Sequence, residues 1–90
     1  MDIEIIRKDI YDIIMQSNIL PEDAILKDDT LLSEYGLDSV GIVELIISIE
    51  EKYDFEFSSN ELNLKDFETV KSISLLVHKL VLRNKENKLG

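Results

Sequence analysis

The chain has 90 residues, 44% of them hydrophobic, and a formal net charge of -9. That length suits one compact domain and leaves little room for a deep catalytic cleft beside a core. The acidic balance argues against nucleic acid as a partner, because a phosphate backbone attracts clustered lysine and arginine. With no cysteine and one histidine, neither a disulfide framework nor a structural zinc site is expected.

The sequence contains neither a secretory signal nor an apolar stretch near the ~18 residues that a membrane span requires. We therefore expect a cytoplasmic protein without a membrane span, and separately we expect a monomer. The charge is concentrated in the middle third, where residues 34 to 56 include seven acids and one base. Such a surface favours partners that are basic.

Apolar residues recur at helical spacing in three stretches. The first, formed by Ile3, Ile6, Ile10, Ile13 and Ile14, predicts a helix from residue 3 to about 16, ended by Asn18 and Pro21. The second begins after residue 38, with a core stripe formed by Ile42, Leu45, Ile46, Ile49 and Tyr53. The third has a core stripe formed by Val70, Ile73, Leu76, Val77, Leu80 and Val81. With one or two short turns over residues 58–67, the pattern predicts an all-α bundle of three longer helices plus one short helix.

A long loop, about residues 18 to 37, joins the first two predicted helices. Loops of that length in compact domains are usually functional or held in place by their own side chains. Five apolar residues could hold this one, namely Ile25, Leu26, Leu31, Leu32 and Leu37. Residues 84–90 are polar and expected to fray, so we assign residues 1–83 to the folded domain.

The segment Gly36-Leu37-Asp38-Ser39 directly precedes the second helix. Gly36 allows a turn, and Asp38 is a suitable N-cap whose charge suits a helix N-terminus. Ser39 then becomes the first helical residue, with its hydroxyl at the end of the bundle. Taken alone, an aspartate and a serine at this position are most often simply a helix cap.

The surrounding residues give this segment a family resemblance. The stretch from Asp29 to Val40 (DTLLSEYGLDSV), with Val43-Glu44-Leu45 and the run from Ile49 to Tyr53 after it, resembles the acyl and peptidyl carrier protein family. That family's attachment motif is Gly-x-Asp-Ser followed by an apolar residue, commonly Leu. The resemblance spans roughly residues 3 to 82. Val40 replaces the common Leu, and Gly41 stands where many fatty-acid carriers have an acid, which favours carriers of polyketide or nonribosomal peptide pathways.

The resemblance implies a specific site. A phosphopantetheinyl transferase would attach 4'-phosphopantetheine from coenzyme A to Ser39, and Asp38 would be the motif acid recognised in that reaction. The arm would then hold acyl intermediates of fatty-acid, polyketide or related biosynthesis as thioesters. The alternatives within the family are aminoacyl, peptidyl or D-alanyl cargo. The carrier itself would contribute no catalytic residue, because loading enzymes and downstream synthases act on its cargo.

The second helix has an apolar stripe beyond its core stripe, formed by Val40, Val43 and Ile47. A helix in a small bundle needs one buried face, so this second stripe either is exposed or means that the helix is buried on both sides. An exposed apolar strip beside acids is a plausible docking site. The resemblance favours docking and adds the acids Glu44, Glu50 and Glu51, which match acids that the family sets against basic partners.

Other site types fit the sequence poorly. A calcium loop starting at Asp28 would place Leu32 at its fifth position and Ser39 at its twelfth, where oxygen ligands and a glutamate are required. His78 has no nucleophile near it in sequence, so we interpret it as a surface or boundary residue. The remaining alternative from another class is an acidic helical adaptor that carries no prosthetic group.

Overall fold

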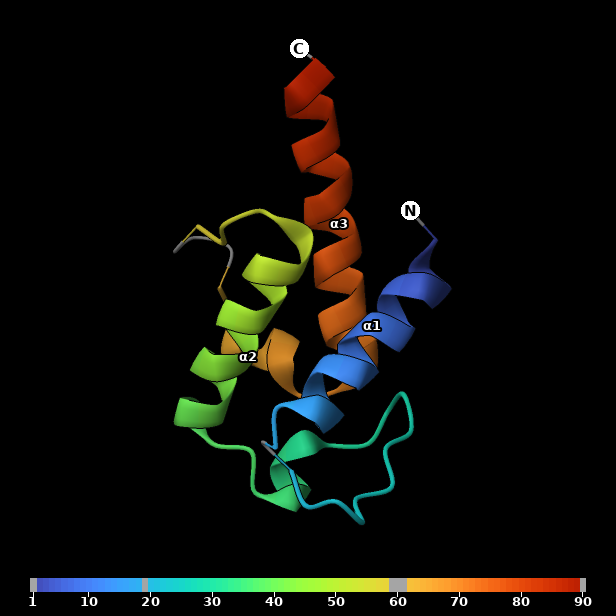
Figure 1. Cartoon of the computed structure of the whole chain (residues 1–90), viewed down its shortest axis with the longest axis vertical. Coiled ribbons are helices and arrows are strands. Elements are labelled where there is room, and N and C mark those ends of the chain that lie inside the picture. Colours follow the sequence, from blue (N-terminus) through green and yellow to red (C-terminus); the bar gives the residue numbers. More distant parts are fainter. Residues whose placement is uncertain (1, 19, 59–61, 90) are drawn as a thin grey trace.

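Three α-helices form a bundle in the computed structural model, which describes residues 2–18, 20–58 and 62–89, with side chains described as far as residue 83 (Figure 1). The helices are α1 (Ile3–Gln16), α2 (Ser39–Tyr53) and α3 (Val70–Leu89). Two short 3₁₀ helices, η1 (Leu32–Tyr35) and η2 (Leu64–Phe67), lie in the connections. The described residues contain no strand, and the predicted all-α bundle is confirmed.

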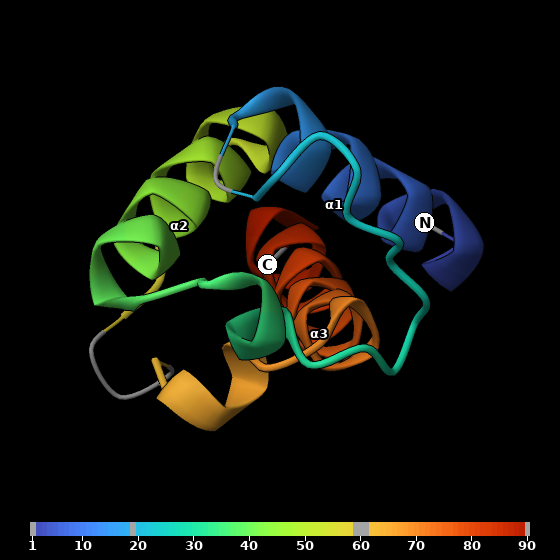
Figure 2. The same ribbon diagram turned by 90° about the horizontal axis from the view of Figure 1, so that it is seen from below.

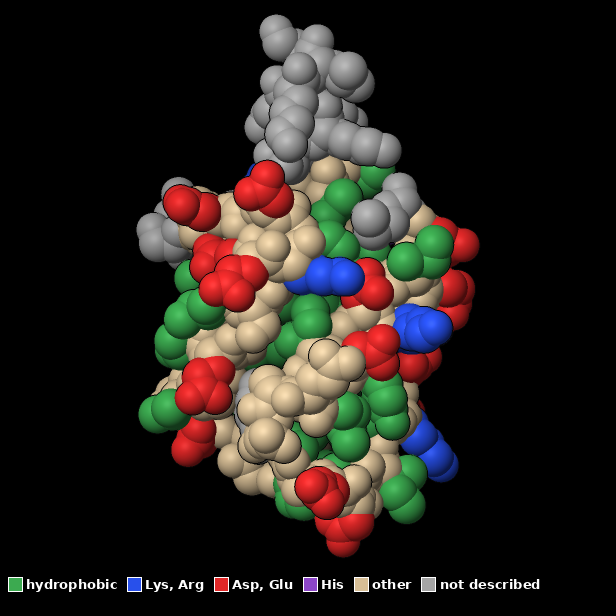
Figure 3. Space-filling model, in the orientation of Figure 1, with side chains coloured by type: hydrophobic (Ala, Val, Ile, Leu, Met, Phe, Trp, Pro, Cys, Tyr) green, Lys and Arg blue, Asp and Glu red, His purple; other side chains and the backbone are tan. Residues whose placement is uncertain are grey.

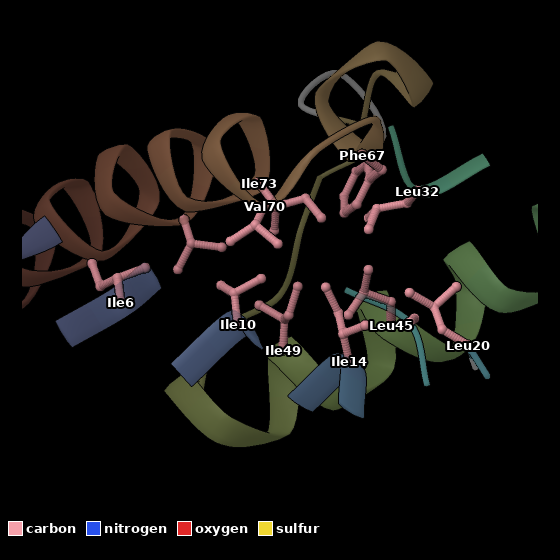
Figure 4. Packing of buried hydrophobic residues seen from close by; sticks show 12 residues of the cluster. Ile6, Ile10, Ile14, Leu20, Leu32, Leu45, Ile49, Phe67, Val70 and Ile73 are labelled. Atoms are coloured by element: carbon pink, nitrogen blue, oxygen red, sulfur yellow. The ribbon is translucent and has the colours of Figure 1, made fainter. Parts of the chain in front are cut away.

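The core lies where the three helices meet, and the predicted helical stripes supply it. In Figure 2 α3 is seen nearly end-on, with α1 and α2 on one side and η2 on the other. The apolar side chains that are at most 2% exposed come from all five elements, and most are drawn in Figure 4: Ile6, Ile10, Ile14, Leu32, Leu45, Ile49, Phe67, Val70, Ile73 and Val77. Burial of these side chains is the main stabilising contribution to a domain of this size.

The long first loop is held to the start of α3 by its backbone. The N–H of Leu32 donates to the carbonyl of Glu68 at 2.8 Å, and the N–H of Lys71 donates to the carbonyl of Asp28 at 2.9 Å. The Tyr35 hydroxyl donates to the Ile25 carbonyl at 3.2 Å and closes the loop on itself. Because η1 is thus fixed against the bundle, the chain enters α2 from a rigid support.

The prediction of which side chains hold this loop is partly wrong. Leu32 is buried, and Leu26 and Leu37 pack against the core, but Ile25 is 72% and Leu31 is 42% exposed. Leu20 and Ala24 are buried instead. The physical reason is that the hydrogen bonds to Tyr35 already hold the backbone at Ile25, so its side chain is not needed in the core.

The connection between α2 and α3 and the C-terminal segment can also be compared with the predictions. Of the segment expected to form short turns, residues 64–67 form η2, while residues 59–61 lie outside the described residues. Helix α3 continues to Leu89, through the segment assigned from sequence to a polar tail. The boundary of the folded domain at residue 83 stays a prediction.

A partly buried polar contact joins α2 to α1. The Tyr53 hydroxyl donates to the Asp9 carboxylate at 2.8 Å, across 44 residues of sequence. Burial of the hydroxyl and the nearby Asp9 carboxylate raise the pKa of Tyr53 well above its ordinary value. Tyr53 is therefore neutral over the physiological range, and it can donate this hydrogen bond throughout.

Two substitutions in α2 should separate the buried face from the exposed one. Leu45→Ala removes a side chain that is 0% exposed and should lower the free energy of unfolding by about 2–5 kcal/mol. Ile47→Ala, on the same helix but 49% exposed, should cost less than about 1 kcal/mol. Urea unfolding followed by circular dichroism measures both. Equal losses would contradict the assignment of the two faces.

Candidate functional site

The turn between η1 and α2 fixes where α2 begins. Gly36 has a φ of 94°, a conformation that side chains with a Cβ rarely adopt. Two residues later Asp38 is extended, and its Oδ1 accepts a hydrogen bond from the N–H of Gly41 at 2.9 Å. This is the geometry of an N-cap, and the prediction that α2 starts at Ser39 is confirmed.

Ser39 is exposed at the first position of α2. The hydroxyls of Ser72 and Ser74 donate to backbone carbonyls at 2.8 and 2.7 Å. Within the described part of the chain, the Ser39 hydroxyl makes no such hydrogen bond. It is accessible for a covalent bond, and the unpaired N–H groups of the first helical turn favour a negative group there. The residues present therefore fit a phosphodiester at Ser39.

The outer face of α2 carries the second apolar stripe. Val40 is 65%, Val43 is 54% and Ile47 is 49% exposed, while Leu45 and Ile49 on the opposite face are 0% exposed. Glu44 and Glu51 lie beside the stripe and are also exposed. Figure 3 shows carboxylates gathered next to apolar side chains over the side of the molecule where α2 lies. The alternative that α2 is buried on both sides is wrong.

Glu50 is placed differently from the other two glutamates. It is half-buried, and its Oε2 accepts a hydrogen bond from the N–H of Phe57 at 2.9 Å. The chain reverses here through Asp54, which has a φ of 56°. Glu50 therefore holds the segment after α2 against the helix, a structural role that the sequence pattern did not indicate.

A groove lies at the C-terminal end of α2, and sequence reasoning did not place it. Its volume is about 560 Å³, and it is lined by Ile47, Glu50, Glu51, Asp54, Phe55 and Glu56. The T-shaped contact of Phe55 with Phe57, with ring centroids 5.1 Å apart, supports its apolar side. The only sequence signal for this feature is the short apolar alternation after Asp54, which does not reveal that the chain folds back onto α2.

Among the residues that the structure describes, no helix is both long enough and apolar enough to cross a bilayer. The described side chains include no group of three or more potential metal ligands. Asp38, the acid nearest to Ser39 in sequence, is used as a helix cap.

Comparison with known proteins defines the class to which this site belongs. The family model for a phosphopantetheine attachment site matches residues 10–77. The chain is 44% identical over 66 residues to an aminoacyl carrier protein of Agrobacterium fabrum, covering 73% of this chain and 77% of that protein. It is 30% identical over 73 residues to an acyl carrier protein of Coprothermobacter proteolyticus, covering 81% and 87%. The chain therefore belongs to the phosphopantetheine-binding carrier protein family.

Solved structures of carrier proteins are similar to this fold, two of them as follows. One is a chain in the crystal structure of the Bradyrhizobium japonicum glycine:[carrier protein] ligase complexed with glycylated carrier protein, with a TM-score of 0.68, 22% identity, and coverage of 80% of this chain and 97% of that one. The other is the solution structure of a holo acyl carrier protein from Nitrosomonas europaea, with a TM-score of 0.54, 30% identity, and coverage of 87% and 94%.

These findings establish what the protein does at the level of the family. It is a carrier protein with a 4'-phosphopantetheine prosthetic group, and, like the relatives that it matches, it is a carrier and not an enzyme.

Proposed function

We propose that Ser39 is the residue that carries the phosphopantetheine arm. The observation that carries this proposal is the placement of Ser39, exposed and without a described hydrogen bond at the first position of α2. In the attachment reaction the Ser39 hydroxyl loses its proton as its oxygen bonds to phosphorus, and the transferase expels the nucleotide part of coenzyme A. When bound, the group supplies a terminal thiol that holds cargo as a thioester.

Asp38 supports attachment by holding Ser39 in place. Its Oδ1 binds the Gly41 N–H at 2.9 Å, so the backbone at Ser39 is constrained from both sides, by the cap and by the first helical turn. The Asp38 side chain is nevertheless exposed, and we assign its carboxylate a second role as the acid that the transferase recognises.

Incubation with coenzyme A, Mg²⁺ and a broad phosphopantetheinyl transferase should raise the intact mass by one phosphopantetheine. Ser39→Ala should abolish the adduct, while Ser33→Ala, which alters another exposed serine in η1, should retain it. Asp38→Asn, which preserves the cap, should slow the reaction if the charge is recognised. An adduct on Ser39→Ala would refute the site, and no adduct on the wild type would favour the adaptor alternative.

For the cargo we propose an aminoacyl group. The sequence alone predicted acyl cargo, with aminoacyl cargo as an alternative. The relative with 44% identity is an aminoacyl carrier protein. The acyl carrier protein whose match covers 81% of this chain is 30% identical. Gly41, buried in the first turn of α2, also departs from the acid of many fatty-acid carriers. Acyl cargo is the second candidate, because acyl carrier proteins are also among the relatives.

Loading assays on the holo protein should distinguish the two kinds of cargo. With ATP, a mixture of amino acids and an amino acid:[carrier protein] ligase, we expect a thioester-linked aminoacyl adduct that hydroxylamine removes. With acyl-coenzyme A and an acyltransferase, we expect little loading. Intact-mass measurement reads both reactions, and Ser39→Ala should remain unloaded in each. Loading by the acyltransferase alone would refute aminoacyl cargo while leaving the carrier function intact.

For the docking surface we propose the outer face of α2, made of Val40, Val43, Glu44, Ile47 and Glu51. The support is the exposure of an apolar strip beside two carboxylates, directly C-terminal to Ser39. Glu50 contributes charge to its edge while its main contact is with Phe57. Basic residues on loading enzymes would pair with these acids, which chiefly raises the association rate and leaves dissociation fast.

Charge reversal tests this surface without disturbing the fold. Glu44→Lys with Glu51→Lys should reduce the loading rate by about tenfold or more at low salt, with unchanged circular dichroism. Glu22→Lys with Asp23→Lys alters two exposed acids of the first loop by the same total charge and should have little effect. Equal losses in the two variants would indicate a general charge effect and contradict this docking surface.

A further inference from the structure

The outer face of α3 differs in charge from the rest of the molecule. Between Val70 and Arg83 the sequence contains no aspartate or glutamate, although the whole chain has 19 acids. Lys71 and Lys79 are exposed, and Leu75 and Leu82 are 55% and 42% exposed. Their spacings of four, four and three residues place all four on one side of the helix.

This basic face of α3 complements the outer face of α2 in both apolarity and charge. On α2, Glu44 and Glu51 lie seven residues apart, about 10 Å along the axis; on α3, Lys71 and Lys79 lie eight residues apart, about 12 Å. Each pair of charges flanks one exposed aliphatic side chain, Ile47 on α2 and Leu75 on α3, and a second one, Val43 or Leu82, lies just outside the pair. Flexible lysine side chains readily span the difference of about 2 Å.

We propose that the basic face of α3 binds the outer face of α2 on a second copy of the chain. The contact pairs the stripe of Val43 and Ile47 with Leu75 and Leu82, and it places lysines opposite glutamates. It rests on the same α2 surface that we propose for docking, but it requires neither the prosthetic group nor an enzyme. Self-association therefore covers the outer face of α2, directly C-terminal to Ser39, and withholds that face from enzymes when the carrier is concentrated.

Other occupants of the basic face fit the charges less well. Pairing of two α3 faces would set lysines against lysines, and like charges in contact oppose association. An anionic membrane would attract the two lysines but repel a chain with a net charge of -9. That same net charge opposes the approach of two copies, so the contact is weak and strengthens once salt screens the long-range repulsion.

Sedimentation equilibrium of the unmodified protein, at concentrations from about 10 μM to about 1 mM, should show a mean mass that rises above that of the monomer. Lys71→Glu with Lys79→Glu should weaken association by about tenfold or more. The control, Lys8→Glu with Lys27→Glu, changes two other exposed lysines and gives the same net charge as the α3 variant. Any loss of association in the control therefore measures the effect of net charge alone. The control should associate more strongly than the α3 variant.

A charge exchange provides the sharpest test. Neither the α3 variant nor the variant Glu44→Lys with Glu51→Lys should associate alone, but an equimolar mixture should, because each reversed face then meets a complementary one. Amide NMR shifts on dilution of the wild type should localise to the outer faces of α2 and α3, which keeps the test valid if a variant misfolds.

Several results would overturn the proposal. These are a monomer at every concentration, association unaffected by the α3 substitutions, or a mixture that does not associate. Binding of the basic face to vesicles with anionic lipid, without self-association, would assign the face to a membrane. Failure of phosphopantetheine attachment at Ser39 would refute the proposed site and leave this measurement unaffected.

Discussion

The hydrogen bond from the Gly41 N–H to the Asp38 carboxylate is the contact on which the functional part of the molecule depends. It determines the residue at which α2 begins, and hence that Ser39 lies at the free end of a rigid helix. The backbone hydrogen bonds from Leu32 to Glu68 and from Lys71 to Asp28 hold the preceding loop to the start of α3. A serine placed in this way is accessible to an enzyme and yet fixed relative to the bundle.

Helix α2 serves two purposes because its two faces have different environments. Leu45 and Ile49 are enclosed between α1 and α3 and contribute to the stability of the core. Val43 and Ile47 remain exposed to solvent, and the free-energy cost of that exposed apolar surface is one that a purely structural helix would avoid. The acids near its C-terminal end are also divided in role. Glu51 is exposed, while Glu50 accepts the Phe57 N–H, so a carboxylate that looks like part of a docking rim also holds the following segment.

Much of the fold was predictable because helical periodicity is a local property. The stripes of Ile6, Ile10 and Ile14, and of Val70, Ile73 and Val77, could be read from spacing alone, and each is buried as expected. The loop was less predictable, since Leu20 and Ala24 are buried and Ile25 is not. Burial of a loop residue depends on which distant carbonyls and hydroxyls hold its backbone, and periodicity carries no information about those partners.

The sequence by itself determined the helices, the N-cap at Asp38 and the position of Ser39 directly behind it, because each depends on residues within one or two turns. Only the tertiary structure decided that the second apolar stripe of α2 is exposed rather than buried, since that depends on how α1 and α3 pack around the helix. The tertiary structure also decided that Glu50 is tied to Phe57 and that the basic side of α3 is exposed. These features arise from contacts between segments far apart in the chain, where local pattern has no influence.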